Sequence, residues 1–266
     1  MKRLPFLLCL LATTLASLNA ADTVELPAKE KFHLYLLIGQ SNMAGRGTVE
    51  AQDKVPHPRV LMQDKTGAWV PAVDPLHSDK TAAGVGLGKS FGIAMAENDP
   101  SVTIGLIPCA HGGSPIDAWQ PGVFYPPTKG HPWDDMVKHT HLALEHGVLK
   151  GILWHQGESD SGKPETANAY EGKFHDLIQR VRTEFKAPDV PFVCGQMGIF
   201  SEKPWSADKK RVDKAHRDLP SKVPHTGFAN AEGFHHRGDS VHFDSASYRE
   251  FGKRYAAEMI RLQAAR

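Results

Sequence analysis

Five short apolar runs that alternate with amphipathic stretches constrain the fold of this chain most strongly. The runs cover residues 33–38, 60–62, 102–109, 148–155 and 190–196. Continuous apolar runs of this length are typical of strands buried on both faces. Apolar residues at helical spacing lie between them at 87–98, 133–147 and 170–185. The alternation predicts an α/β fold, a three-layer α/β/α sandwich with a parallel sheet of about five strands.

A last helix is predicted after residue 247. Ser247 and Glu250 have the spacing of a capping box. An apolar stripe follows, formed by Tyr248, Phe251, Tyr255, Met259 and Leu262. No internal repeat or low-complexity linker interrupts the chain, so we expect residues 21–266 to form a single domain. Segments 114–132, 197–211 and 229–239 are irregular, and long loops after parallel strands are where such folds place their sites.

The first twenty residues have the layout of a signal peptide. Lys2 and Arg3 precede a mostly apolar run that ends near Leu18, and small residues follow at Ala20 and Ala21. An uncleaved anchor is the alternative, but the run is shorter than the roughly 20 apolar residues of a transmembrane helix. The sequence therefore predicts a secreted or periplasmic protein, with no stable membrane insertion after cleavage.

Charge and cysteine content limit the partners and the disulfide bonds that we expect of this chain. The chain has 31 basic and 30 acidic residues, and loss of Lys2 and Arg3 changes the net charge from +1 to −1. Without a basic stripe, nucleic acid is not an expected partner. Cys109 and Cys194 remain after cleavage, both in strand-like runs, and we expect two buried free thiols because distant strand ends do not meet disulfide geometry.

Polar or glycine-rich segments follow three of the predicted strands, and a fourth precedes the last helix. Ser41 follows the first strand in Gly39–Gly45, where backbone N–H groups at a turn can face an oxyanion. Gly112 and Gly113 follow the third strand and allow close approach of the backbone to a ligand. Each segment alone is also compatible with an ordinary turn.

The other two segments supply acid–base and amide groups. Gln156 and Glu158 follow the fourth strand, where an amide can donate and a carboxylate can accept from a histidine. Asp239 and His242 lie three residues apart before the last helix. That spacing lets the carboxylate reach Nδ1 of the ring and leaves Nε2 free to take a hydroxyl proton.

The four segments together resemble a known family. GQSNMAG, CAHGGSPIDAW, WHQGESD and DSVHF, in this order, are similar to the consensus blocks of the SGNH-type esterases. The most similar branch is the sialate O-acetylesterase-like group, which includes the acetylxylan esterases of carbohydrate esterase family six. The resemblance covers about Phe32 to Tyr255.

This resemblance implies a flavodoxin-like fold and a serine esterase that removes acetyl groups from carbohydrate without a cofactor. It implies Ser41 as nucleophile, His242 as base, and either Asp239 or Glu158 as the acid. It also implies an oxyanion hole formed by the N–H of Ser41, the N–H of Gly112 or Gly113, and the side chain of Gln156. The acetyl group would be carried by a xylan-type or a sialate-type sugar.

Contacts with the substrate are expected near the nucleophile and in the loop after the second block. Gln40 and Asn42 flank Ser41, and Trp119 and Tyr125 belong to an aromatic-rich loop. These aromatic rings either form an apolar floor for a sugar or pack the loop itself. The histidines match no usual zinc spacing, so no metal is expected.

Two other functions stay open at this level. One is a non-catalytic carbohydrate-binding protein on the esterase fold, although binding alone does not need a nucleophile and a base together. The other is a lipase-like or thioesterase-like hydrolase, which a long apolar channel would indicate.

Overall fold

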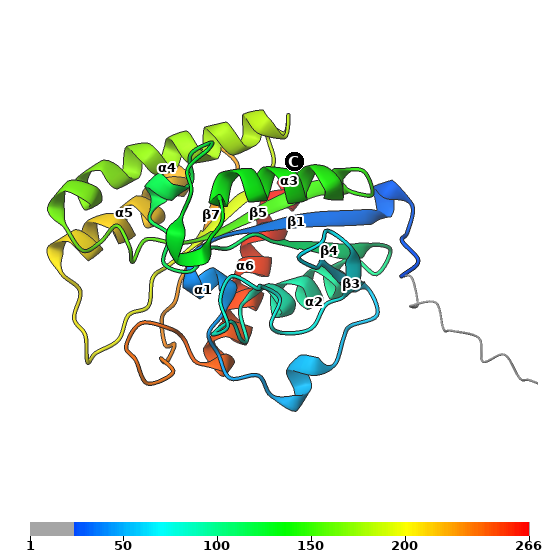
Figure 1. The fold of residues 1–266 in the computed structure, drawn as a ribbon, viewed down its shortest axis with the longest axis horizontal. Helices are drawn as coiled ribbons and strands as arrows, with labels where there is room; N and C mark the ends of the chain where they lie inside the picture. The colour runs from blue at the N-terminus through cyan, green and yellow to red at the C-terminus, as the bar shows by residue number, and fades with distance from the viewer. Residues whose placement is uncertain (1–23, 266) are drawn as a thin grey trace, which may run out of the picture.

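A computed structural model describes residues 24–265 as helices packed on one seven-stranded sheet (Figure 1). The sheet order is β3-β2-β4-β1-β5-β6-β7. Every neighbouring pair is parallel except β2 and β3, which are antiparallel. The strands are β1 (Phe32–Gly39), β2 (Val60–Gln63), β3 (Trp69–Pro71), β4 (Thr103–Pro108), β5 (Val148–His155), β6 (Phe192–Gly195) and β7 (Thr226–Ala229).

The helices form a layer on each face of the sheet (Figure 1). One layer holds α3 (Pro132–Leu144), α4 (Pro164–Glu184) and α5 (Ala207–Lys222), and the other holds α2 (Gly88–Asn98) and α6 (Ser245–Ala264). Shorter helical turns are α1 (Ser41–Ala44), η1 (Lys29–Lys31), η2 (Ala51–Lys54), η3 (Ile116–Ala118) and η4 (Pro126–Thr128). The predicted α/β fold is confirmed, and β3 and β7 are additional to the five predicted strands.

Strand alternation in β1 explains why helices cover both faces. Leu34, Leu36 and Ile38 enter the core on the α3–α4–α5 side, whereas Tyr35 and Leu37 enter the core on the α2–α6 side. Successive side chains of a strand point to opposite faces, so an uninterrupted apolar run needs cover on both. All five side chains are almost completely buried.

Two predictions about helices were wrong. Segment 197–211 was expected to be irregular, but α5 begins at Ala207 after Ser206, whose side chain accepts from the N–H of Lys209. Helix α6 begins at Ser245, three residues before the predicted start. Its N-cap is Asp244, which accepts from the N–H of Ser247, so the capping box of Ser247 and Glu250 does not form.

The remaining expectations concern the cysteines and the N-terminus. Cys109 and Cys194 are buried free thiols, as predicted. The predicted signal peptide, residues 1–20, lies outside the described residues. Within residues 24–265, no helix is both long enough and apolar enough to cross a membrane.

Candidate active site

Backbone hydrogen bonds join the ends of three neighbouring strands, β1, β4 and β5, where the segments that contain Ser41, Gly112 and Gln156 begin. The N–H of Gln40 donates to the carbonyl of His155 at 2.9 Å, and the N–H of His111 donates to the carbonyl of Gly39 at 2.9 Å. Gly39 has φ +135°, and a Cβ there would lie 2.2 Å from the His155 carbonyl oxygen. Only glycine fits this approach, which brings Ser41 beside both neighbouring strand ends.

Ser41, His242 and Asp239 form a continuous hydrogen-bonded chain. The Oγ of Ser41 lies 3.0 Å from Nε2 of His242, and Nδ1 of His242 lies 2.7 Å from Oδ2 of Asp239. Residue 240 between them has φ +52°, a left-handed turn that folds the loop back. The three side chains that sequence spacing suggested are thus in direct contact, in the order that a nucleophile, a base and an orienting carboxylate require.

Asp239 is held in its charged form. Partial burial opposes ionisation, but hydrogen bonds from the backbone N–H and ring of His242 and from the N–H of Val241 outweigh it and lower the pKa of Asp239 to about 2. The stabilising contribution of this carboxylate is present above its ordinary pKa of 3.8 and is lost as the pH falls through about 2. It therefore carries a full negative charge beside the His242 ring near neutral pH.

Glu158, the other candidate acid, contacts a different group. Its Oε1 accepts from the Nδ2 of Asn42 at 2.7 Å, and no hydrogen bond joins it to His242 within residues 24–265. Asn42 also donates to the carbonyl of Val241 at 3.1 Å and accepts from the hydroxyl of Tyr248 at 2.6 Å. Asn42 is fully buried and anchors the loop before His242. This position differs from the substrate contact that was predicted for Asn42.

The two glycines after β4 differ in their hydrogen bonding. The N–H of Gly112 donates to Oδ2 of Asp79 at 2.9 Å. The N–H of Gly113 has no acceptor in the described part of the chain, and neither has the N–H of Ser41. Gly113 has φ +86°, the left-handed region that glycine adopts without strain. Of the two expected oxyanion donors, Gly113 is therefore the one with a free N–H.

Gln156 occupies a buried network. Its Nε2 donates to the carbonyl of Ser114 at 3.1 Å and to Asp160, and its Oε1 accepts from the hydroxyl of Tyr170 at 2.9 Å. Exchanging the amide nitrogen and oxygen would set the oxygen against two acceptors, so this orientation is fixed. Both amide hydrogens are engaged, which differs from the oxyanion role expected for Gln156.

The aromatic residues of the loop after β4 also separate into two groups. Trp119 is completely buried, donates to Oγ of Ser114 at 3.0 Å and packs edge-on against Trp154, so it is a core residue and not a sugar platform. Tyr125 is half-buried, and its hydroxyl would lie 3.2 Å from a Cβ placed at Gly113. Tyr125 therefore borders the segment with the free N–H.

Comparisons with known proteins identify the family. The family model of carbohydrate esterases described as sialic acid-specific acetylesterases matches residues 31–261. The chain belongs to this family. A probable carbohydrate esterase of Arabidopsis thaliana is 31% identical over 241 residues, which are 82% of this chain and 86% of that protein. Family membership makes the chain a carboxylic ester hydrolase and confirms the resemblance of its four blocks.

Solved structures agree with the fold of this carbohydrate esterase. The structure of the Arabidopsis thaliana protein has a TM-score of 0.75 at 28% identity and covers 86% of this chain and 98% of its own. NanS has a TM-score of 0.71 at 17% identity and covers 91% and 100%. A carbohydrate acetylesterase from Xanthomonas citri has a TM-score of 0.64 at 20% identity and covers 88% and 57%. At these identities the last two are similar in fold alone.

The site of this esterase includes a buried ion pair that sequence reasoning missed. Arg46 and Asp79 face each other at 2.7 Å with side chains 5% and 1% exposed. Arg46 also donates to the carbonyl of Gly45 at 2.7 Å, and its own carbonyl accepts from Arg237 at 2.6 Å. Together with the Asp79–Gly112 bond, the pair connects the nucleophile turn, the glycine loop and the acid–base loop. Arg46 directly follows the first block, which could have drawn attention to it, whereas Asp79 lies in a loop far from all four blocks.

No group of three histidine, cysteine, aspartate or glutamate side chains within residues 24–265 is arranged to hold a metal ion.

Proposed function

We propose that this carbohydrate esterase removes O-acetyl groups through a covalent acyl-enzyme. The observation that carries the proposal is the hydrogen-bonded chain from Ser41 Oγ through the His242 ring to Asp239, at 3.0 and 2.7 Å. Such a chain fixes the tautomer of the ring and leaves Nε2 as the acceptor for the serine proton. Ser41 is the nucleophile, His242 the general base, and Asp239 the carboxylate that orients it.

In the first step, Ser41 Oγ forms a bond to the acetyl carbonyl carbon while its proton moves to Nε2 of His242. The tetrahedral intermediate collapses, the bond to the sugar oxygen breaks, and His242 gives its proton to that oxygen. Water then attacks the acetyl-serine with His242 again as base. The second collapse returns Ser41 and releases acetate.

The negative charge of the intermediate needs donors that are not already engaged. The N–H groups of Ser41 and Gly113 meet this condition, whereas Gly112 and Gln156 donate to Asp79, Ser114 and Asp160. We assign the oxyanion hole to Ser41 and Gly113. Gln40 is the expected contact with the acetylated sugar, because its Oε1 accepts only a long 3.4 Å bond from the Ser159 N–H and its Nε2 has no partner among the described residues.

Acetylated carbohydrate, of xylan or sialate type, is the proposed substrate class, and the proposed location is outside the cytoplasm. Export is supported by the signal-peptide layout of residues 1–20. N-terminal sequencing of the protein after expression in a secreting host should give a mature chain that starts near Ala21. A mature chain that still begins at Met1 would contradict export by cleavage.

The test of the chemistry is acetate release by the mature chain and its Ser41→Ala variant. Both are assayed on 4-nitrophenyl acetate, acetylated xylan and an O-acetylated sialic acid. We expect acetate from at least one carbohydrate, lost in the variant. Acetate release that survives the substitution refutes Ser41 as nucleophile. A folded wild-type protein that releases no acetate from any of the three refutes the proposed activity.

A further inference from the structure

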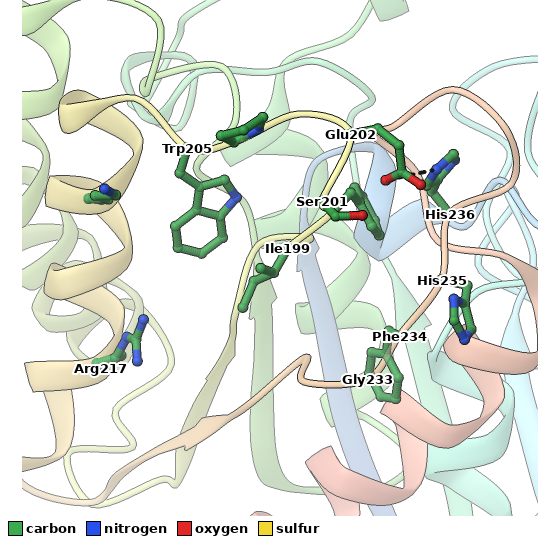
Figure 2. A pocket seen from close by; sticks show the side chains of 12 residues that line it. Ile199, Ser201, Glu202, Trp205, Arg217, Gly233, Phe234, His235 and His236 are labelled. Atoms are coloured by element: carbon green, nitrogen blue, oxygen red, sulfur yellow. Dashed lines mark ion pairs between the residues drawn. The ribbon is translucent and has the colours of Figure 1, made fainter.

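A cavity of about 770 Å³ lies between the segment after β6 and the segment after β7. Figure 2 shows Trp205 and Arg217 on one side of it and Phe234, His235 and His236 on the other. Neither Ser41 nor His242 lines this cavity, and no step of the proposed chemistry uses it.

Basic side chains dominate the charged groups of the cavity. Lys210 and Arg217 line it from α5, and Lys210 has no acidic partner among residues 24–265. Arg217 donates through Nε to the buried Asp213 at 2.6 Å, and its two terminal NH₂ groups have no hydrogen-bond partner in the described part of the chain. The carboxylate among the lining residues is Glu202, which lies 3.6 Å from Nε2 of His236 on the side of the cavity away from α5 (Figure 2). The α5 side of the cavity therefore carries the positive groups, and Glu202 carries the negative one on the opposite side.

Aromatic side chains supply the apolar part of the wall. Phe200 and Phe234 are 6% and 8% exposed, and Trp205 is half-buried with its N–H donating to the Gly198 carbonyl at 2.9 Å. Apolar walls with a few charged groups at the edge suit a sugar ring, whose C–H faces are apolar and whose substituents are polar. The positive α5 side, with Lys210 and the terminal NH₂ groups of Arg217, suits a ring that carries a carboxylate.

The cavity shares a wall with the loop that carries Asp239 and His242. Nδ1 of His236 accepts from the N–H groups of Gly238 at 2.9 Å and Ser240 at 3.2 Å, the residues on either side of Asp239. The ring of Phe200 packs 5.0 Å from the ring of His236 and 5.8 Å from that of Phe243, the residue after His242. The cavity thus borders the loop that carries the base, the group that returns a proton to the departing sugar.

We propose that this cavity is a subsite for a carboxylate-bearing sugar of an oligosaccharide, one unit or more away from the acetylated sugar. This inference rests on the proposed esterase function. The acetylated sugar itself must lie over Ser41 and His242, neither of which lines the cavity. A carboxylate that reaches Lys210 and Arg217 consequently belongs to a neighbouring unit of the same chain.

The test compares two acetylated xylotetraoses that differ only in a 4-O-methylglucuronic acid branch. 4-Nitrophenyl acetate and monomeric O-acetyl sialic acid are assayed in parallel. The variants are Lys210→Gln with Arg217→Gln, and Lys210→Glu alone, which leaves the Arg217–Asp213 contact intact. Lys214→Gln is the matched control, because Lys214 is on the same helix, 71% exposed, and pairs with Asp218 outside the cavity.

We expect kcat/KM for the acidic oligosaccharide to exceed that for the neutral one by about 10-fold at low salt, and the ratio to shrink as salt rises. The double variant and Lys210→Glu should bring this ratio of kcat/KM values to within about two-fold of unity, whereas Lys214→Gln should keep the wild-type ratio. The rates of all variants on 4-nitrophenyl acetate should equal the wild-type rate. Equal efficiency on both oligosaccharides in the wild type overturns the proposal, and so does a preference that the cavity variants leave intact.

Monomeric O-acetyl sialic acid tests whether the bound carboxylate belongs to the acetylated sugar or to a neighbouring unit. If O-acetyl sialic acid loses efficiency in the cavity variants as strongly as the oligosaccharide does, the carboxylate belongs to the acetylated sugar itself and the neighbouring-unit subsite is wrong. Failure of the esterase proposal looks different, since it removes Ser41-dependent acetate release from all four substrates.

Discussion

Replacing Asp239 with asparagine should disable the proposed base while preserving the fold of the loop. The amide oxygen of asparagine can still accept from the N–H groups of Val241 and His242, which lie 2.9 and 2.8 Å from the Asp239 carboxylate. Its NH₂ group then faces Nδ1 of His242, 2.7 Å from the present Oδ2. An NH₂ group cannot accept the Nδ1 proton, so the ring takes the other tautomer and its Nε2 can no longer receive the proton of Ser41.

The magnitude depends on how well water can replace the lost acceptor. In Ser-His-Asp enzymes the wrong tautomer lowers kcat by about 10⁴, or about 5.4 kcal/mol of barrier. The side chains of His242 and Asp239 are 24% and 40% exposed, so water can restore part of the productive tautomer. We therefore expect kcat on 4-nitrophenyl acetate to fall by about 100- to 10,000-fold, with KM changed by less than about three-fold.

Glu158→Gln is the matched comparison. Glutamine keeps an oxygen that can accept from Nδ2 of Asn42, the contact that Glu158 makes at 2.7 Å. We expect this variant to retain kcat to within about 10-fold. Steady-state kinetics on purified variants with matched thermal unfolding would decide between the two carboxylates. An Asp239→Asn enzyme within 10-fold of the wild type, together with a Glu158→Gln enzyme that loses most activity, would refute the assignment.

Three other substitutions have expected outcomes. Gln156→Ala should lower the free energy of unfolding by about 2–4 kcal/mol, because it leaves buried hydrogen-bond partners unpaired. Denaturant unfolding measures this change. An unchanged stability together with a kcat reduced 100-fold would return Gln156 to the oxyanion hole. Asp79→Asn should reduce kcat about 10-fold with little change in KM, because Gly112 and the buried Arg46 lose their charged partner. Stopped-flow and steady-state assays measure both constants, and a change in KM alone contradicts the prediction. Burial raises the pKa of Asp74 to about 7, so the stability of the wild type should fall as the pH rises from about 4 to 7, by up to about 4 kcal/mol. Asp74→Asn should flatten that decline in pH-dependent unfolding, and an identical decline in both proteins would show that Asp74 does not cause it.

The sheet was predictable where strands are long and buried on both faces. The predicted range 148–155 coincides with β5, whose last five residues are buried. The two strands that were not predicted, β3 and β7, have three and four residues and lie at the edges of the sheet. Short edge strands bury less and carry a weaker apolar signal.

Helix α5 was missed for a different reason. It is strongly polar overall, and only a narrow stripe that includes Val212, Ala215 and Leu219 is buried. That stripe has helical spacing, but lysine, arginine and aspartate surround it, and the first five residues of the helix, 207–211, were assigned to an irregular segment. The period of the apolar residues was a better guide than their number.

The site was predictable in its order along the chain but not in all its contacts. The contact of Asp239 with His242 was predictable from their three-residue spacing, which is a local property of the sequence, whereas the pairing of His242 with Ser41 was implied by the family resemblance. The engagement of Gly112 by Asp79 and of Gln156 by Ser114 and Asp160 depends on which loops meet after folding. Residue type indicates that a group can donate, whereas the fold decides whether its hydrogens are already used.

The two halves of the catalytic chain are held in physically different ways. Ser41 follows a strand in the middle of the sheet, and backbone bonds from Gln40 and His111 join its turn to both neighbouring strand ends. His242 instead lies on a loop whose backbone is held by side chains, through Asn42 to the Val241 carbonyl and through His236 to the N–H groups beside Asp239. Side-chain bonds of this kind yield to single substitutions, whereas the backbone bonds between strands do not. The position of the nucleophile is therefore set by the fold, and the position of the base is set by a few side chains, one of which, His236, also lines the neighbouring cavity.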